Sequence, residues 1–253
     1  MMEKQFVLPE APVSKKTSSP ENLIVYSKPK VGKTTMLSKL DDCLIIDLEQ
    51  GSNKIDALKV QADNLKELYR WITEIKKAEK KYKYIAVDTI TELESWCEWD
   101  ATAMYMKTPM GKNFNRHDTK TDPKTGQQAV LPKSQWESVL TLPKGAGYLY
   151  LRNSFKKWVN MLMELADHVI FIAHVKDGSS DKKGKEVATK DLDLTGKLKT
   201  IIAQKADAIG YVYWEGEELM ISFSSKDGIE ANSRCEHLKN TVMPFEWDKI
   251  YVD

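Results

Sequence analysis

The sequence predicts an α/β fold in which helices flank a mainly parallel sheet, and three observations support this prediction. Short and continuous apolar runs, typical of strands buried on both faces, occur at residues 23–26, 43–47, 84–88 and 168–174. Residues 64–82, between the second and third runs, carry apolar side chains at helical spacing. Residues 148–166 repeat this spacing before the fourth run. Strands that alternate with helices in this way indicate parallel pairing.

Two segments depart from the alternation. Residues 107–145 are rich in Gly, Pro, Thr and Lys with little periodicity, which predicts a long loop or small excursion. Residues 208–223 predict two strands joined by a polar turn at residues 215–217, which is a late β-hairpin. We therefore expect a flexible N-terminal arm over residues 1–21 and a single domain over residues 22–253.

Composition limits the function classes. The chain of 253 residues has a formal net charge of +1, so no whole-protein field attracts it to nucleic acid or to an anionic membrane. Its three cysteines have no C-x-x-C spacing, which is typical of a reduced protein without a structural zinc site. No apolar run approaches the roughly 20 residues of a membrane span, and the N-terminal stretch lacks the apolar region of a signal peptide. We expect a cytoplasmic protein with no membrane partner.

A phosphate-binding loop is the strongest motif in the chain. The stretch SKPKVGKTT matches the pattern G-x-x-x-x-G-K-[ST], except that Ser27 stands at the first glycine position. In this pattern Gly32 lets the backbone approach the phosphates, Lys33 reaches the β- and γ-phosphates, and Thr34 offers its hydroxyl to Mg²⁺. The predicted nucleotide-binding residues are Ser27, Lys28, Pro29, Lys30, Val31, Gly32, Lys33, Thr34 and Thr35. The alternative is a solvated Lys/Gly loop between a strand and a helix.

Acidic residues follow two further apolar runs. Asp88 ends the third run, where the Mg²⁺-binding carboxylate of a phosphate-loop enzyme belongs, although it could instead cap the following helix. Asp47 and Glu49 leave the second run in the same way. Acids at these strand ends, beside a phosphate loop, predict a site for ATP and Mg²⁺ with Thr34 and Asp88 as metal ligands. Thr89 is a further candidate for the shell of the Mg²⁺ ion.

The order of four motifs, SKPKVGKTT, LIIDLEQG, IAVDTITEL and VIFIAHVKD, resembles RecA-like P-loop ATPases, and especially the compact phage-encoded proteins of the Sak-type single-strand annealing group. The likeness spans residues 23–226. It implies a RecA-like core in which residues 168–174 form a strand between the phosphate-loop strand and the acidic strand. It also implies catalytic roles for Lys33 at the phosphates, Glu49 at the attacking water and His174 as a sensor of the γ-phosphate.

The chemistry of these side chains agrees with the implied roles. A carboxylate near the γ-phosphate can accept a proton from water, and an imidazole at a strand end can donate a hydrogen bond to a phosphate oxygen. The alternatives are a solvated loop acid for Glu49 and a strand-end histidine with a backbone partner for His174.

Two basic segments predict a nucleic-acid partner. The first is the excursion at residues 107–145, and the second follows His174 in a glycine-rich stretch that we expect to be mobile. We expect both to leave the same edge of the sheet and to bind single-stranded DNA, as the resemblance to the two DNA-binding loops of RecA-like proteins implies. The candidate DNA-binding residues are Lys112, Arg116, Lys120, Lys176, Lys182, Lys183 and Lys185. The alternative is that both segments are solvated connections.

RecA-like ATPases complete their site from a neighbouring subunit, so the resemblance implies a homo-oligomer, as a ring or a filament. Lys226 and Arg234 are the candidates for a basic finger that reaches the neighbour's γ-phosphate, and each could equally be a surface cation. The apolar stretch at residues 4–13 is a candidate for pairing with a neighbour, since an apolar patch on a flexible end needs a partner to bury it.

The predicted function is an ATP-binding and ATP-hydrolysing DNA recombination protein of phage type, which binds single-stranded DNA and promotes annealing or strand pairing in the host cell cytoplasm. Other phage recombination proteins or single-strand-binding proteins would be its further partners. One alternative is a nucleotide-gated partner protein such as a helicase loader. Another is a small-molecule kinase, which the small number of arginines disfavours because kinase lids surround the transferred phosphate with several of them.

Overall fold

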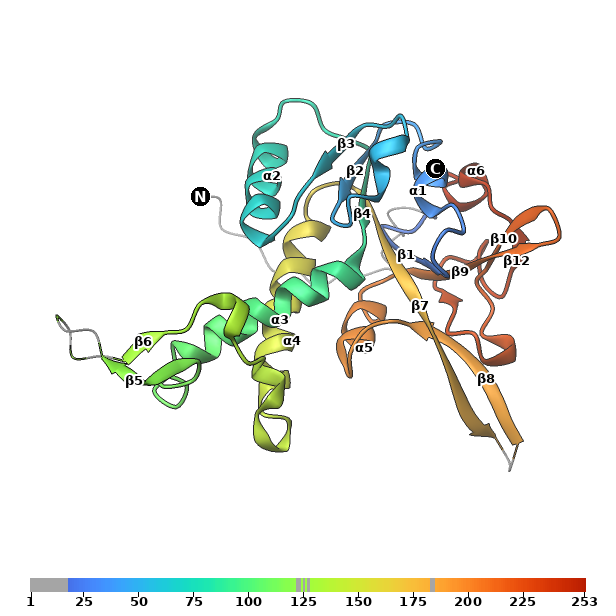
Figure 1. Ribbon diagram of the computed structural model, residues 1–253. Coiled ribbons are helices and arrows are strands. Elements are labelled where there is room, and N and C mark those ends of the chain that lie inside the picture. Colours follow the sequence, from blue (N-terminus) through green and yellow to red (C-terminus); the bar gives the residue numbers. More distant parts are fainter. Residues whose placement is uncertain (1–17, 122–123, 125, 127, 183–184) are drawn as a thin grey trace, which may run out of the picture.

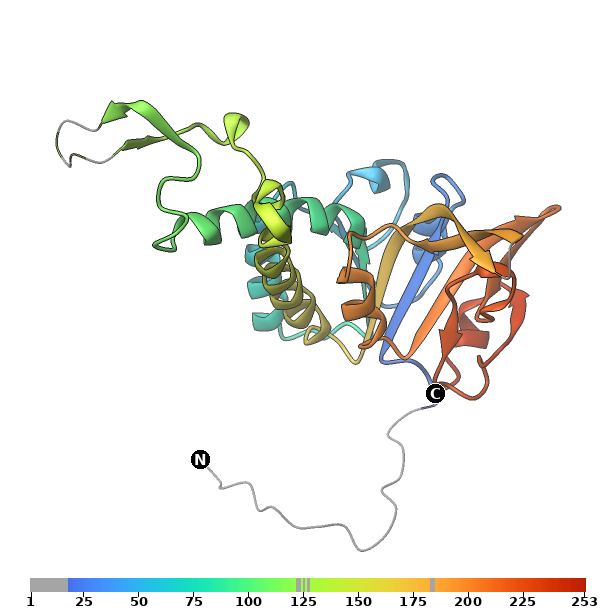
Figure 2. The same cartoon turned by 90° about the horizontal axis from the view of Figure 1, so that it is seen from below.

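The computed structural model describes residues 18–121, 124, 126, 128–182 and 185–253. Within these residues, ten strands form one sheet in the order β12-β10-β9-β1-β7-β4-β2-β3, with β11 paired to β9 and β8 paired to β7 (Figures 1 and 2). The strands are β1 (Asn22–Ser27), β2 (Cys43–Asp47), β3 (Lys59–Gln61), β4 (Tyr84–Asp88), β7 (His168–Lys182), β8 (Lys185–Leu192), β9 (Ala208–Glu215), β10 (Glu218–Ser222), β11 (Asn232–Ser233) and β12 (Val242–Pro244).

The central strands are parallel, and their carboxyl ends lie at one edge of the sheet. β7 lies between β1 and β4 and pairs parallel with both, which confirms the position expected for the strand at residues 168–174. In this register Ser27 lies beside His174, and Asp47 of β2 lies beside Asp88 of β4. The strand ends that carry the predicted site residues therefore meet at the same edge.

The predicted strands and the late hairpin are confirmed. The four apolar runs correspond to β1, β2, β4 and the first half of β7. β9 pairs antiparallel with β10, and the turn between them contains Gly216 at φ +61°, a left-handed conformation that favours glycine. β3 was not predicted; it is a strand of only three residues.

Helices cover both faces of the sheet. One face carries α2 (Leu65–Lys77), α3 (Ile90–Met106), α4 (Gly147–Met163) and α5 (Leu198–Ala203), and the other carries α1 (Lys33–Leu37) and α6 (Trp247–Ile250). The helical spacing in the sequence explains α2, because Leu68, Ile72 and Ile75 are buried while Asn64 caps the first turn by accepting from two backbone amides. Among the described residues, no helix is long and apolar enough to cross a membrane.

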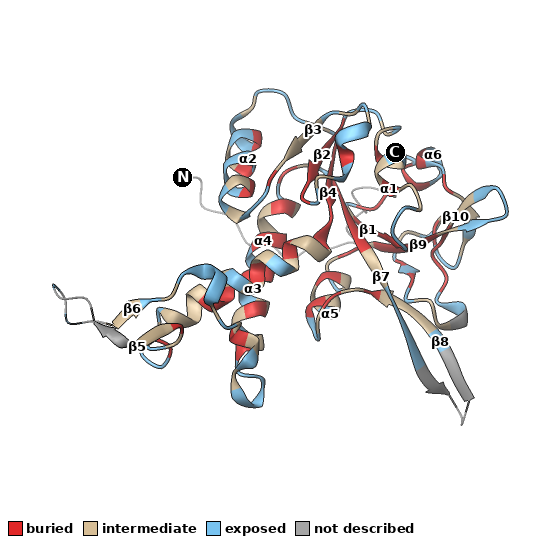
Figure 3. Cartoon of the chain, in the orientation of Figure 1, coloured by how far each residue is buried: buried red, intermediate tan, exposed pale blue. Residues whose placement is uncertain are grey.

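The prediction of a loop after His174 was wrong. β7 continues to Lys182 and pairs antiparallel with β8, in a register that runs from Val175 opposite Leu192 to Lys182 opposite Lys185. We call residues 175–192 the arm. Figure 3 shows the described residues of β7 changing from buried inside the sheet to exposed in the arm. β-branched residues in the returning stretch favour a strand there, and the glycines misled the sequence interpretation.

The excursion at residues 107–145 does not leave the sheet edge, which corrects a second expectation. It begins after the far end of α3, a helix of 17 residues and therefore about 25 Å long. It contains the hairpin of β5 (Arg116–Thr121) and β6 (Gln128–Val130), followed by three short 3-10 helices. Figures 1 and 2 show this hairpin and the arm projecting away from each other, so the two basic segments are not side by side.

The expected N-terminal arm lies mostly outside the described residues, and so does its apolar stretch at residues 4–13. At the first described residues, the backbone amides of Ser18 and Ser19 donate to Oδ2 of Asp253 at 2.6 and 2.7 Å. The two described ends of the chain therefore meet at the same place on the molecule.

Phe171→Ala should lower the free energy of unfolding by about 3–5 kcal/mol, because Phe171 is fully buried in the central strand β7. Urea unfolding followed by circular dichroism measures this change. Leu149→Ala on α4 is the control: Leu149 is 53% exposed, and its loss should change stability by less than about 0.5 kcal/mol. Equal effects of the two substitutions would contradict the central placement of β7.

Candidate active site

A cavity of about 410 Å³ opens at the carboxyl ends of the parallel strands, next to the loop after β1. Ligand sites of open α/β sheets occur at this edge. The lining residues are Pro29, Lys30, Gly32, Lys33, Thr34, Thr35, Glu49, Gly51, Ile55, Asp88 and His174. The structure thus brings six of the nine predicted nucleotide-binding residues, both predicted metal ligands, and the predicted catalytic residues Glu49 and His174 to one cavity. Ser27, Lys28 and Val31 of the predicted set do not line it.

The phosphate loop presents one buried lysine to this cavity. Gly32 has φ +107°, which an L side chain rarely adopts, and it immediately precedes α1. Because α1 has only five residues, its dipole is small, and attraction of an anion depends mainly on Lys33 and the backbone amides of the loop. Nζ of Lys33 donates to Oγ of Ser27 at 2.9 Å and to the carbonyl of Lys28 at 3.2 Å. Burial lowers the pKa of Lys33, and the nearby carboxylates of Asp88 and Glu49 oppose this effect.

Thr34 and Asp88 form an oxygen pair that fits a small divalent cation. Oγ1 of Thr34 donates to Oδ2 of Asp88 at 2.6 Å, and both side chains line the cavity. Burial raises the pKa of Asp88, while the hydrogen bond from Thr34 opposes this effect. Among the described residues, no group of three or more His, Cys, Asp or Glu side chains could hold a metal ion. This donor set fits Mg²⁺, which prefers hard oxygens and commonly takes one or two protein ligands together with phosphates and water.

Glu49 is held by one of its two carboxylate oxygens. Its Oε1 accepts from Oγ1 of Thr89 at 2.5 Å and lies 2.8 Å from Nε2 of His174, which places the imidazole proton on Nε2. Among the described residues, no hydrogen bond reaches Oε2, so this oxygen is free to accept a proton from a water molecule in the cavity. Burial acts to raise the pKa of Glu49, but the hydrogen bonds from His174 and Thr89 outweigh it and hold that pKa below the usual range. Glu49 is therefore ionised near neutral pH and can act as a general base.

Two threonines hold Glu49 and His174 in place, and the sequence interpretation did not predict these contacts. Oγ1 of Thr91 accepts from the backbone amide of His174 at 3.1 Å, which fixes the end of the sheet part of β7. Thr89, considered for the Mg²⁺ shell, holds Glu49 and also caps α3 by accepting from the amide of Glu92 at 3.2 Å. The sequence feature that could have revealed these contacts is the presence of Thr89 and Thr91 just after Asp88, because threonine is favoured where a helix begins.

Asp47 has a different position from its neighbour Glu49. Its carboxylate accepts from the amides of Glu49 and Ser52 at 3.0 and 2.9 Å, and from Oγ of Ser52 at 2.6 Å. Burial acts to raise its pKa, but the hydrogen bonds from Ser52 outweigh this effect and lower it. Asp47 is buried away from the cavity and shapes the loop that carries Glu49.

The candidate DNA-binding residues lie on two separate projections. Lys176 is exposed on the arm, whereas Lys112 is exposed on the excursion. Arg116 donates to the backbone carbonyls of Lys112 and Gln128, so its guanidinium holds the excursion together. The side chains of Lys120, Lys182 and Lys185, and all of Lys183, lie outside what the structure describes.

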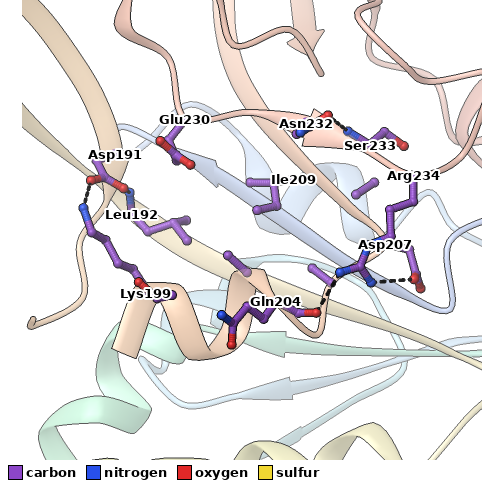
Figure 4. A pocket seen from close by; sticks show the side chains of 14 residues that line it. Asp191, Leu192, Lys199, Gln204, Asp207, Ile209, Glu230, Asn232, Ser233 and Arg234 are labelled. Carbon is purple, nitrogen blue, oxygen red and sulfur yellow. Dashed lines mark hydrogen bonds and ion pairs between the residues drawn. The ribbon is translucent and has the colours of Figure 1, made fainter. Parts of the chain in front are cut away.

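The two candidate finger residues lie outside the cavity of their own chain. Arg234 pairs with Asp207 at 3.7 Å, donates to the carbonyl of Gln204 at 2.9 Å, and lines a second pocket of about 390 Å³ beside α5 (Figure 4). This pocket adjoins the amino end of β9, at the opposite end of the strands from the phosphate loop. Lys226 is exposed in a 3-10 turn that packs beside β8 of the arm.

A parallel sheet with a lysine-bearing glycine loop after its first strand, and a buried acid at the end of the strand two positions away, defines a P-loop NTPase. A family model described as an AAA domain matches residues 19–235, and the chain belongs to this family of AAA domains, which places it among nucleotide-binding ATPases. A search of curated proteins returns no match. The match and the sheet together confirm the predicted fold class, a P-loop NTPase core with a mainly parallel sheet, flanking helices and a late hairpin.

Glu49→Gln should leave nucleotide affinity nearly unchanged and lower the turnover number for hydrolysis by about 10²–10⁴-fold, because an amide cannot take the proton from water. Phosphate release under saturating nucleotide measures turnover, and calorimetry measures affinity. Glu79→Gln is the control, since Glu79 is exposed and remote from the cavity. Equal turnover in both variants and the wild type would remove Glu49 from the mechanism.

Proposed function

We propose that this protein is a Mg²⁺-dependent ATPase that binds single-stranded DNA and promotes annealing or strand pairing in recombination of the phage type. The observation that carries the proposal is the continuity of β7. This strand lies in the core of the sheet, passes His174 beside the cavity, and continues without a break into the arm, whose sequence carries several lysines. A change at the nucleotide site therefore has a short and direct route along β7 to the base of the arm.

In the proposed reaction, Lys33 and the amides of the phosphate loop neutralise the β- and γ-phosphates of ATP. Oε2 of Glu49 accepts a proton from the attacking water, while Thr89 and His174 keep the carboxylate in place through Oε1. When bound, Mg²⁺ would be held by Thr34 and Asp88 and would stabilise the charge that develops on the phosphates. His174, bonded to Glu49 and lying at the base of the arm, reports the state of the γ-phosphate.

A second contact supports communication between the phosphate loop and the arm. Asp177 of the arm lies 3.8 Å from Nζ of Lys28 in the phosphate loop, and it also pairs with Lys190 across the arm. The Lys28–Asp177 pair is 58% exposed on both sides, so it contributes little to stability. It does place the start of the phosphate loop directly against the base of the arm.

Single-stranded DNA is the proposed partner because the arm sequence has a net charge of +1, from five lysines against four acids, and four of these lysines precede residue 186: Lys176, Lys182, Lys183 and Lys185. Lysine binds phosphate as a point charge without a preferred geometry, which suits binding without sequence preference. The excursion, with Lys112, Arg116 and Lys120, is proposed as a second contact.

We extend the proposal to the setting that the family resemblance implies. The protein acts as a homo-oligomer, as a ring or a filament, in which Arg234 or Lys226 approaches the cavity of a neighbouring copy. The proposed place of action is the host cell cytoplasm, together with other phage recombination or single-strand-binding proteins. The position of Arg234 at the far end of its own sheet favours a role between subunits over a role within one chain.

Single-stranded DNA should stimulate steady-state ATP hydrolysis in the presence of Mg²⁺, and the stimulation should fade as salt rises. The logarithm of DNA affinity should fall with the logarithm of salt concentration by about 0.7 for each phosphate contact. Replacing the four arm lysines named above by alanine should remove most of the stimulation and flatten the salt dependence, while hydrolysis without DNA stays the same.

The matched control replaces the same number of lysines around α2, namely Lys66, Lys76, Lys77 and Lys80. Because the change in net charge is the same, any difference between the two variants reports on position. Hydrolysis that is indifferent to DNA in the wild type would overturn the DNA proposal and favour a nucleotide-gated partner protein. Stimulation by a small-molecule acceptor instead would indicate a kinase.

A further inference from the structure

Ser27 is the one residue of the loop that departs from the phosphate-loop pattern, and the structure gives its hydroxyl two partners. Oγ of Ser27 accepts from Nζ of Lys33 at 2.9 Å and donates to the carbonyl of Lys28 at 2.7 Å. Ser27 is fully buried, and its bond to Lys33 is buried with it, whereas its bond to the carbonyl of Lys28 is only partly buried. Its hydroxyl therefore lies between the loop backbone and the lysine that faces the cavity.

The backbone at this position does not require glycine. Ser27 is the last residue of β1 and pairs with His174 on one side and Val212 on the other, as an ordinary strand residue. It is absent from the residues with positive φ in the described chain, whereas Gly32 in the same loop has φ +107°. A serine at the first position is thus free of backbone strain, and its side chain is available for another role.

The ammonium group of Lys33 has three N–H donors, and the structure accounts for two of them. One donates to Ser27 and one to the carbonyl of Lys28, while the third remains for an anion in the cavity that Lys33 lines. With glycine at position 27, only the carbonyl would hold the ammonium, and the long side chain would keep more of its rotational freedom.

We propose that Ser27 is a positioning residue that holds the ammonium of Lys33 toward the β- and γ-phosphates, so that serine strengthens nucleotide binding relative to the glycine of the usual pattern. The proposal rests on the ATP site described above and deepens it. A rival reading of the same contacts makes Ser27 a competitor that keeps Lys33 away from phosphate. The two interpretations predict opposite changes in ATP affinity when the hydroxyl of Ser27 is removed. Loss of a positioning contact would weaken binding, whereas loss of a competitor would tighten it.

The test is a titration of the full-length protein with Mg²⁺-ATP, Mg²⁺-ADP and AMP, for the wild type, Ser27→Ala and Ser27→Gly. A lost hydrogen bond to a charged group predicts an increase of about tenfold in the dissociation constants of ATP and ADP for both variants. AMP has no β-phosphate for Lys33 to reach, so its affinity should stay the same. A general distortion of the loop would weaken all three ligands, which separates positioning from a structural effect.

Ser38→Ala is the matched control. The hydroxyl of Ser38, at the end of α1, donates to the carbonyl of Thr35 at 2.9 Å and makes no contact with Lys33, so this variant should bind all three ligands like the wild type. Thermal unfolding of each variant checks that it is folded, and Ser27→Ala keeps almost the full volume of the side chain.

Unchanged or tighter ATP binding in Ser27→Ala and Ser27→Gly would overturn the positioning role and leave the ATP site intact. An equal loss for AMP and ATP would also overturn it. A wild-type protein that binds no Mg²⁺-ATP would overturn the ATP site itself and this inference with it, so the two failures are distinguishable.

Discussion

The parallel register of β1, β7 and β4 is the constraint on which the rest of the structure depends. Backbone pairing places Ser27 level with His174, and Asp88 two residues before that level, at one edge of the sheet. A slip of one residue in β7 would turn His174 away from Glu49 and bring Ala173 or Val175 to its place, because successive strand residues face opposite sides. The buried apolar side chains of β7 hold this register, since a slip would also expose part of the core on each face.

At this edge, the carboxylate of Glu49 and the ammonium of Lys33 each have some atoms fixed by hydrogen bonds and one atom left for the ligand in the cavity. Glu49 is anchored through Oε1 and keeps Oε2 for the cavity, and Lys33 is anchored through two N–H groups and keeps the third. Such preorganisation reduces the reorganisation that the reaction requires, because the orienting contacts exist before charge develops. The anchoring groups are the hydroxyls of Thr89 and Ser27, the carbonyl of Lys28 and the imidazole of His174.

The sequence predicted the parts of this arrangement that depend on local pattern. Continuous apolar runs located β1, β2, β4 and the core of β7, and the spacing of glycine and lysine located the phosphate loop. Residue pattern alone did not separate Asp47 from Glu49, and only the family resemblance gave Glu49 the catalytic role. The two side chains differ through the way the loop folds back onto Ser52, which pattern does not reveal. It also mistook the arm for a loop, because the pairing of β7 with β8 depends on contacts between strands and not on apolar periodicity.

The most direct test of the account is calorimetric titration of Mg²⁺-ATP into the wild type and Lys33→Ala, with Lys66→Ala as a control for the loss of one exposed lysine. We expect one site per chain in the wild type and in the control, and an affinity lower by about a hundredfold or more in Lys33→Ala, because the phosphates lose their buried ammonium. Wild-type affinity in Lys33→Ala would contradict the central claim that the strand ends and the loop after β1 form the nucleotide site.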